Sequence, residues 1–153
     1  MSLRRLAVKA AVLPFVIAAC AGSGPAITPS LAPTHSPAPT PAAQRIVVTL
    51  SDQMRIEPAM MTVRSGEPVT FVVTNGGQIA HEFYLGDEAA QAAHDQEMAV
   101  GGMAHDEENG IGLEPGETKE LTYTFASPGQ WLAGCHVPGH YASGMKAAIT
   151  ISD

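Results

Sequence analysis

Beyond residue 43 the chain is a succession of short runs rich in β-branched and aromatic residues, each closed by glycine, proline or asparagine. Apolar and polar residues alternate in the run that holds Leu121, Tyr123 and Phe125, a pattern typical of a strand with one buried face. Runs of this kind, about seven or eight in number, predict an all-β fold, a Greek-key β-sandwich with antiparallel strands. The runs cover residues 45–50, 61–63, 69–74, 79–85, 118–125, 130–135 and 146–151.

One segment interrupts this pattern. Residues 87–112 are too many for a hairpin loop. Residues 88–100 are rich in alanine, glutamine and glutamate, Asp87 stands where a helix cap is expected, and Gly101 and Gly102 follow. The sequence therefore predicts one short helix in an inserted loop.

The first 43 residues have a different composition. Residues 1–19 combine a basic start with a short apolar run, which predicts a secretory signal peptide rather than a membrane span. The run ends at Ile17-Ala18-Ala19-Cys20, which resembles a bacterial lipobox. Lipidation of Cys20 would anchor the protein to a membrane surface. The alternative is ordinary cleavage after a site of small residues.

Residues 20–43 consist mainly of alanine, proline, serine and threonine. Such a segment has little to bury and predicts an extended, semi-rigid linker. The expected organisation is a signal peptide at 1–19, a lipid-anchored linker at 20–43 and one folded domain at 44–153. The expected location is extracytoplasmic, either periplasmic or on the cell surface.

The charge of the chain limits its partners. Without residues 1–19, five Lys and Arg remain against fifteen Asp and Glu, a formal charge near −10. This balance argues against nucleic acid and anionic lipid as partners. It suits a basic redox or copper-transfer protein, and it equally suits simple solubility. We expect a monomer.

The strongest chemical signal lies near the end of the domain. Cys135, His140 and Met145 follow one another at intervals of five residues, between the last two predicted strands. With Cys20 expected to carry lipid, Cys135 has no disulfide partner, and a metal ion is its simplest occupant. Two imidazoles, one thiolate and a distant thioether are typical of an electron-transfer copper site. His81 is the candidate for the second imidazole.

These features resemble the cupredoxins, the small blue copper proteins that include plastocyanin, azurin and auracyanin. The resemblance covers residues 44–153, and it includes a V-x-x-G-x-x-V-x-F-x-x-x-N segment at 63–75 and the Cys-x₄-His-x₄-Met loop. It implies a cupredoxin-like fold and one type 1 copper ion that cycles between Cu²⁺ and Cu⁺. The implied ligands are His81, Cys135, His140 and Met145. Many cupredoxins carry asparagine after the first histidine, whereas this chain has Glu82.

The insert contains a second group of candidate ligands, His94, Met98, Met103 and His105, among acidic residues. Histidine and methionine mixtures suit copper, and methionine favours the cuprous ion. The alternative is an acidic solvated helix with Met98 packed on the sandwich. This insert also loosely resembles cupredoxin-like lipoproteins associated with copper tolerance. His136 is expected to point away from the copper site, because adjacent strand residues face opposite sides.

Two functions follow from the sequence. The first is a membrane-tethered, extracytoplasmic one-electron carrier. The alternative is a copper-homeostasis or tolerance protein that sequesters or transfers copper, with additional His and Met ligands in residues 87–112. We do not expect an enzyme, because four protein ligands leave no open position on the metal.

Overall fold

The computed structural model describes residues 43–101 and 106–153. The predicted signal peptide and the predicted linker up to residue 42, including the predicted lipidation site Cys20, lie outside the described residues. So do the candidate ligands Met103 and His105. Among the described residues, no helix has the length and apolar character needed to cross a bilayer.

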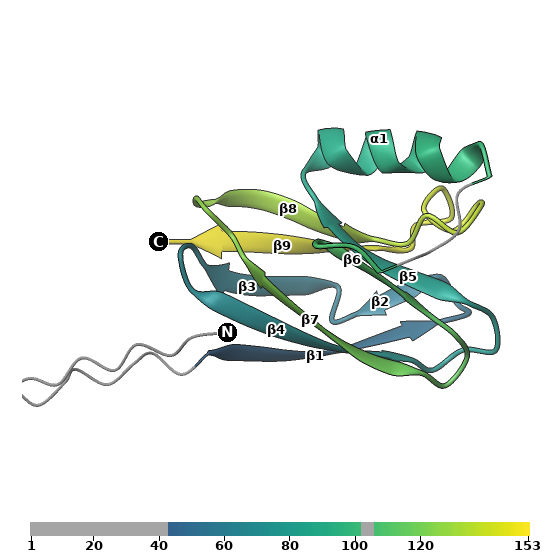
Figure 1. Ribbon diagram of the computed structural model, residues 1–153, viewed down its shortest axis with the longest axis horizontal. Helices are drawn as coiled ribbons and strands as arrows, with labels where there is room; N and C mark the ends of the chain where they lie inside the picture. Colours follow the sequence, from purple (N-terminus) through teal and green to yellow (C-terminus); the bar gives the residue numbers. More distant parts are fainter. Residues whose placement is uncertain (1–42, 102–105) are drawn as a thin grey trace, which may run out of the picture. The chain divides into compact units, whose positions relative to one another are not determined.

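Two β-sheets and one helix make up the domain (Figure 1). The first sheet has the order β2-β1-β4-β7 and the second has the order β3-β9-β8-β5-β6. The prediction of an all-β sandwich with one helix is confirmed. The first sheet consists of β1 (Gln44–Ser51), β2 (Arg55–Glu57), β4 (Pro68–Asn75) and β7 (Thr118–Thr124). The second consists of β3 (Met60–Arg64), β5 (His81–Gly86), β6 (Gly110–Leu113), β8 (Gly129–Gly134) and β9 (Lys146–Ser152).

The sequence pattern predicted antiparallel strands, and this part of the prediction is wrong for two pairs. Strand β1 runs parallel to β4, and β3 runs parallel to β9, whereas the other pairings are antiparallel. Both parallel pairs join strands that are not consecutive in the chain. Such pairs form only when the sheets assemble, so alternation within a single run does not reveal them.

The core lies between the two sheets. Alternate residues of β4, namely Val69, Phe71 and Val73, are buried, as the period of a strand requires. Phe71 of the first sheet and Phe83 of the second meet with ring centroids 5.4 Å apart. Truncating such a ring to alanine typically costs about 3–5 kcal/mol of stability.

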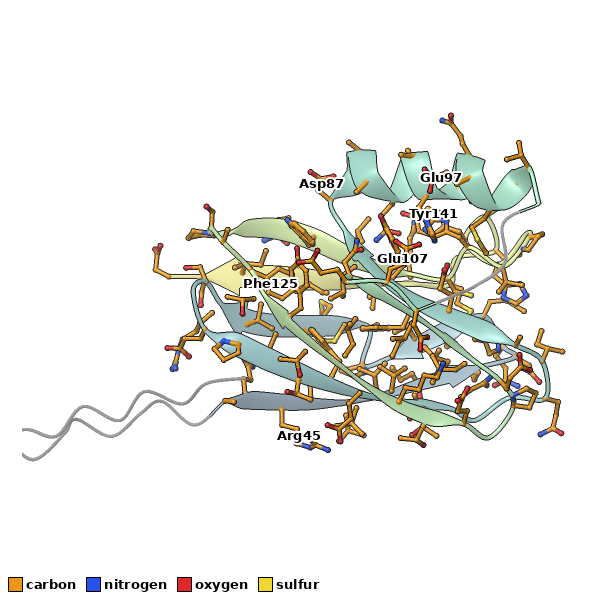
Figure 2. All side chains as sticks on the ribbon, viewed as in Figure 1. Arg45, Asp87, Glu97, Glu107, Phe125 and Tyr141 are labelled. Carbon is orange, nitrogen blue, oxygen red and sulfur yellow. The ribbon has the colours of Figure 1, made fainter. Side chains whose placement is uncertain are left out.

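Helix α1 (Glu88–Ala99) lies against the outer face of the second sheet, above β5 and β8 (Figure 1). Asp87 caps it as predicted, because its side chain accepts a hydrogen bond of 2.8 Å from the Ala90 N–H. Figure 2 shows Asp87 at the start of this helix. The buried positions of α1 are Gln91, His94 and Met98. Two of these three are polar, so the helix docks through hydrogen bonds as well as apolar packing.

Candidate metal centre

Three predicted ligands meet at one end of the second sheet. His81 is the first residue of β5, Cys135 directly follows β8, and His140 lies in the loop between β8 and β9. Strands β5 and β8 are antiparallel neighbours, with Tyr84 opposite Gly134. The residues that follow β8 therefore run beside the beginning of β5. This topology brings together residues that are 54 positions apart in the chain.

The geometry of these three side chains suits one metal ion. Cys135 Sγ lies 3.9 Å from His81 Nδ1 and 3.4 Å from His140 Nδ1. One ligand atom from each residue lies within 4.8 Å of the other two. Donors in a trigonal plane at 2.0–2.3 Å from one ion are separated by roughly 3.7 Å. The three donors therefore already stand at the spacing that an ion requires. Among the described residues, this is the one such group of His, Cys, Asp and Glu side chains.

The site is buried, and burial sets the protonation of its ligands. Cys135 is 0% exposed, and burial raises the pKa of its thiol to about 11. Hydrogen bonds from the backbone N–H groups of Glu82 and Val137 act in the opposite direction. A bound metal ion deprotonates such a thiol outright. Burial also lowers the pKa of His140, and the neighbouring His81 lowers it further, which favours the neutral imidazole that binds metal.

A carboxylate orients the first ligand. His81 Nε2 lies 3.1 Å from Asp52 Oδ1, so this nitrogen donates to the carboxylate and Nδ1 is left to face the sulfur. The N–H of Gln78 donates to the other oxygen of Asp52 at 2.8 Å. This bond is the largest cause that lowers the pKa of Asp52, and the contact with His81 lowers it further. A Cβ atom at Gly77 would collide with this carboxylate, so glycine leaves the space for it.

Asn75 holds the turn that leads to His81. Its side chain is fully buried, donates to the carbonyls of Ile79 and Leu113, and accepts the N–H of Gly77. The sequence motif included this asparagine, but its pattern did not reveal the role. Asp52 was missed altogether, since a single aspartate in a turn resembles any solvated residue.

The loop from Cys135 to Met145 is closed by its own backbone. The Cys135 N–H donates to the Met145 carbonyl at 3.1 Å, and the Met145 N–H donates to the His140 carbonyl at 3.1 Å. Met145 is fully buried at the end of this loop. Its role as the weak fourth ligand stays a prediction.

Beyond the ligands, the histidines that the structure describes are His94 and His136, and both lie on the helix side of the sheet. His136 directs its ring nitrogens to Gln91 and Asp95 of α1, away from the three ligands. His94 Nε2 lies 2.9 Å from Glu82 Oε1, and its Nδ1 lies 3.6 Å from Glu97 Oε2. Both nitrogens of His94 thus face carboxylates. Met98 is 3% exposed. A second metal site that includes His94 and Met98 stays a prediction, and metal binding there would disrupt these contacts.

Comparisons with known proteins identify the family. Residues 43–152 match the family described as copper binding proteins, plastocyanin/azurin family. The fold is similar to that of reduced auracyanin from Roseiflexus castenholzii, with a TM-score of 0.65 and 26% identity over 73% of this chain and 99% of that one. The chain therefore belongs to the plastocyanin/azurin family of copper-binding proteins, and copper is the cofactor that His81, Cys135 and His140 are placed to hold.

Two curated relatives indicate a particular branch of this family. The copper-resistant cuproprotein CopI of Rubrivivax gelatinosus is 40% identical over 121 residues, which cover 78% of this chain and 73% of that protein. The copper-resistant cuproprotein CopI of Pseudomonas aeruginosa is 32% identical over 145 residues, covering 75% of this chain and 80% of that protein. The predicted resemblance to cupredoxins is confirmed, and so is its link to the copper-tolerance subgroup.

Proposed function

We propose that this protein serves copper tolerance outside the cytoplasm, by binding copper and sequestering it or handing it on. The observation that carries the proposal is the buried triangle of His81, Cys135 and His140, whose donors already have the spacing of metal ligands. The names of the curated relatives favour copper resistance over the electron-carrier role that the sequence analysis placed first. Both roles use the same metal centre.

Growth in the presence of copper tests this role. The full chain is expressed in a copper-sensitive bacterium, beside its Cys135→Ser variant and an empty vector. Wild type should raise the copper concentration that halves the growth rate, and Cys135→Ser should not. Equal growth of all three strains, with the wild-type protein present and copper-loaded, would exclude the tolerance role while leaving copper binding intact.

Copper stoichiometry tests the additional ligands of the insert. Wild type and a variant with His94, Met98, Met103 and His105 changed to alanine are loaded with excess copper and then dialysed. If the insert binds metal, wild type retains more than one ion per chain and the variant retains one. Retention of a single ion by wild type contradicts a second site.

Electron transfer remains the second candidate, and the preformed site favours it. Ligands that are already in place need little rearrangement between two oxidation states. We propose that four protein ligands leave no position for a substrate, so the protein is not an enzyme. A reversible voltammetric wave with fast self-exchange supports a carrier. If a basic redox partner is involved, its reaction rate should fall as salt is added.

We propose further that Cys20 carries a lipid, which anchors the protein to the membrane surface. Labelling with a radioactive fatty acid should mark wild type and fail to mark Cys20→Ser. An unlabelled wild-type chain contradicts the anchor. The expected monomer is tested by light scattering on the folded domain.

A further inference from the structure

Glu82 links the copper loop to the rest of the molecule through its backbone and its side chain. Its N–H donates to Cys135 Sγ at 3.3 Å. Its carboxylate turns to the other side of the strand, where Oε2 accepts the His136 N–H at 3.0 Å. His136 directly follows Cys135, and the next residue, Val137, lowers the pKa of the thiol through its backbone N–H. The Glu82 side chain therefore holds the segment that carries the sulfur.

A histidine of helix α1, His94, binds the Glu82 carboxylate. His94 Nε2 donates to Glu82 Oε1 at 2.9 Å, and the two side chains are 3% and 2% exposed. The His94 ring stacks on Tyr84 of β5, with centroids 3.9 Å apart and planes inclined by 3°. A buried carboxylate oxygen that loses its partner is strongly destabilised. His94 thus fixes Oε1 of the Glu82 carboxylate, whose Oε2 is bound by the His136 N–H.

The same helix also holds His136. Gln91 Oε1 accepts from His136 Nε2 at 2.7 Å, and Asp95 Oδ1 lies 3.1 Å from His136 Nδ1. The amide nitrogen of Gln91 donates to the carbonyls of Tyr84 and Leu132, which ties the helix to β5 and β8.

Glycines at the ends of β5 and β8 allow the helix to pack closely against the sheet. A Cβ atom at Gly134 would overlap the Gln91 amide and the Tyr141 ring, and one at Gly86 would lie 2.9 Å from Ala90 Cβ. Tyr141 lies under the helix (Figure 2) and stacks on the His136 ring at 4.4 Å. The glycines and the hydrogen bonds together hold α1 in close contact with the segment that carries Cys135.

We propose that His94 is a positioning residue of the copper centre, through which helix α1 fixes the hydrogen bonds to the copper-binding sulfur. His94 acts through Glu82 and His136 and does not itself bind the metal in this role. Because bonds to a metal-ligating sulfur tune the metal, loss of His94 should change the colour and potential of the copper site while leaving copper bound. The inference rests on copper binding by His81, Cys135 and His140.

Three substitutions test this role. His94→Phe keeps a ring that can stack on Tyr84 but removes the hydrogen bond to Glu82. His94→Gln keeps a donor and is the conservative rescue. Asp87→Ala is the matched control, because it removes the helix cap and leaves the buried network untouched. Each protein is loaded with one copper ion, and its visible spectrum and midpoint potential are measured. Amide exchange at residue 136 is followed in the cuprous form.

His94→Phe should shift the sulfur-to-copper band and the potential, and it should raise amide exchange at His136 about tenfold or more, as expected for loss of a bond to a buried charged group. His94→Gln should return all three quantities toward wild type. Asp87→Ala should leave the band and potential unchanged. A wild-type band and wild-type exchange in His94→Phe overturn the proposal. An equal shift in Asp87→Ala also overturns it, because general loosening of the helix then explains the effect.

A double-substitution cycle keeps the test decisive if the His94 variants lose much stability. Glu82→Gln retains an acceptor for the His136 N–H and lacks the charge. If His94 acts through Glu82, the band shift caused by His94→Phe should be smaller when Glu82→Gln is already present. Purely additive shifts contradict the proposed route. Should copper fail to bind to His94→Phe, His94 is required for the site itself and the positioning role is wrong.

Discussion

Two buried histidines of this protein share one feature and differ in another. His81 and His94 each direct Nε2 at a carboxylate, Asp52 at 3.1 Å and Glu82 at 2.9 Å. The second nitrogen of His81 faces the sulfur of Cys135, whereas that of His94 faces the Glu97 carboxylate. A histidine held by a carboxylate is therefore a ligand or a structural link depending on what its other nitrogen meets.

The surroundings of the two histidines explain this difference. The metal end holds a thiol and two imidazoles with no carboxylate among the three ligands, so the donors suit copper. The helix end holds histidines whose ring nitrogens face carboxylates and an amide. Its groups satisfy one another, as buried polar groups must. The predictions below test this contrast, beginning with the largest expected effect.

Removing His81 should weaken copper binding, whereas removing His94 should not. His81→Ala removes a ligand and should weaken copper binding by more than the 10–100-fold typical of an outer partner. His94→Ala should retain one ion per chain. Competition with a chelator of known affinity measures both constants. Equal losses in the two variants would break the contrast.

The thiol should make the metal-free protein sensitive to alkali. Burial raises the pKa of Cys135 from 9.0 to about 11, so the folded state holds the thiol proton more tightly than the unfolded state does. The contribution of the protonated thiol to the free energy of unfolding is complete below pH 9 and is lost as the pH rises through 11. Two pKa units correspond to about 3 kcal/mol of unfolding free energy.

Urea unfolding of the metal-free wild type and of Cys135→Ala, at several pH values between 8 and 12, isolates this contribution. The difference in free energy of unfolding between wild type and Cys135→Ala should narrow or reverse as the pH rises. A difference that does not change with pH contradicts the buried neutral thiol.

Asp52 should matter to copper affinity where Glu97 does not. Asp52→Asn keeps the shape of the side chain and weakens its hold on the His81 Nε2–H, so copper affinity should fall about 10–100-fold. Glu97→Gln is the matched control, because the Glu97 side chain is 76% exposed and its carboxylate lies beside His94. Isothermal titration with copper in a competing buffer measures both. An unchanged affinity in Asp52→Asn would remove Asp52 from the centre.

The smallest effect is expected at the helix cap. Asp87→Ala removes the bond to the Ala90 N–H and should lower the free energy of unfolding by about 1 kcal/mol. Copper affinity should stay within twofold or so of wild type, because the cap does not touch the buried network. Thermal unfolding of the metal-free protein measures the first quantity. If the free energy of copper binding falls by more than the free energy of unfolding, the whole helix supports the site.

Several elements were predictable because their signals are local. The long strands, the helix and its Asp87 cap follow from residue types and their period. Strands β2 and β6 were missed, since β2 has three residues and β6 contains two glycines among four. Such short or glycine-rich segments pair only because a neighbouring strand is already present.

The candidate ligands were also predictable, and the structure brings His81, Cys135 and His140 together as expected. Cys135, His140 and Met145 belong to one loop with a specific spacing, and His81 lies within the run predicted as a strand at 79–85. The partner of His81 was not predictable, because Asp52 stands 29 residues away in a turn. The role of Glu82 was equally hidden: its backbone reaches the sulfur while its side chain belongs to the helix side.

By itself, the sequence determined the strand pattern, the copper-type donors and the presence of a helix, because each depends on residues that are near one another in the chain. The tertiary structure alone decided which carboxylate holds each histidine ring and where the helix docks. Those outcomes depend on which strands become neighbours when the two sheets pack, and burial then requires each polar group to find a partner across that packing.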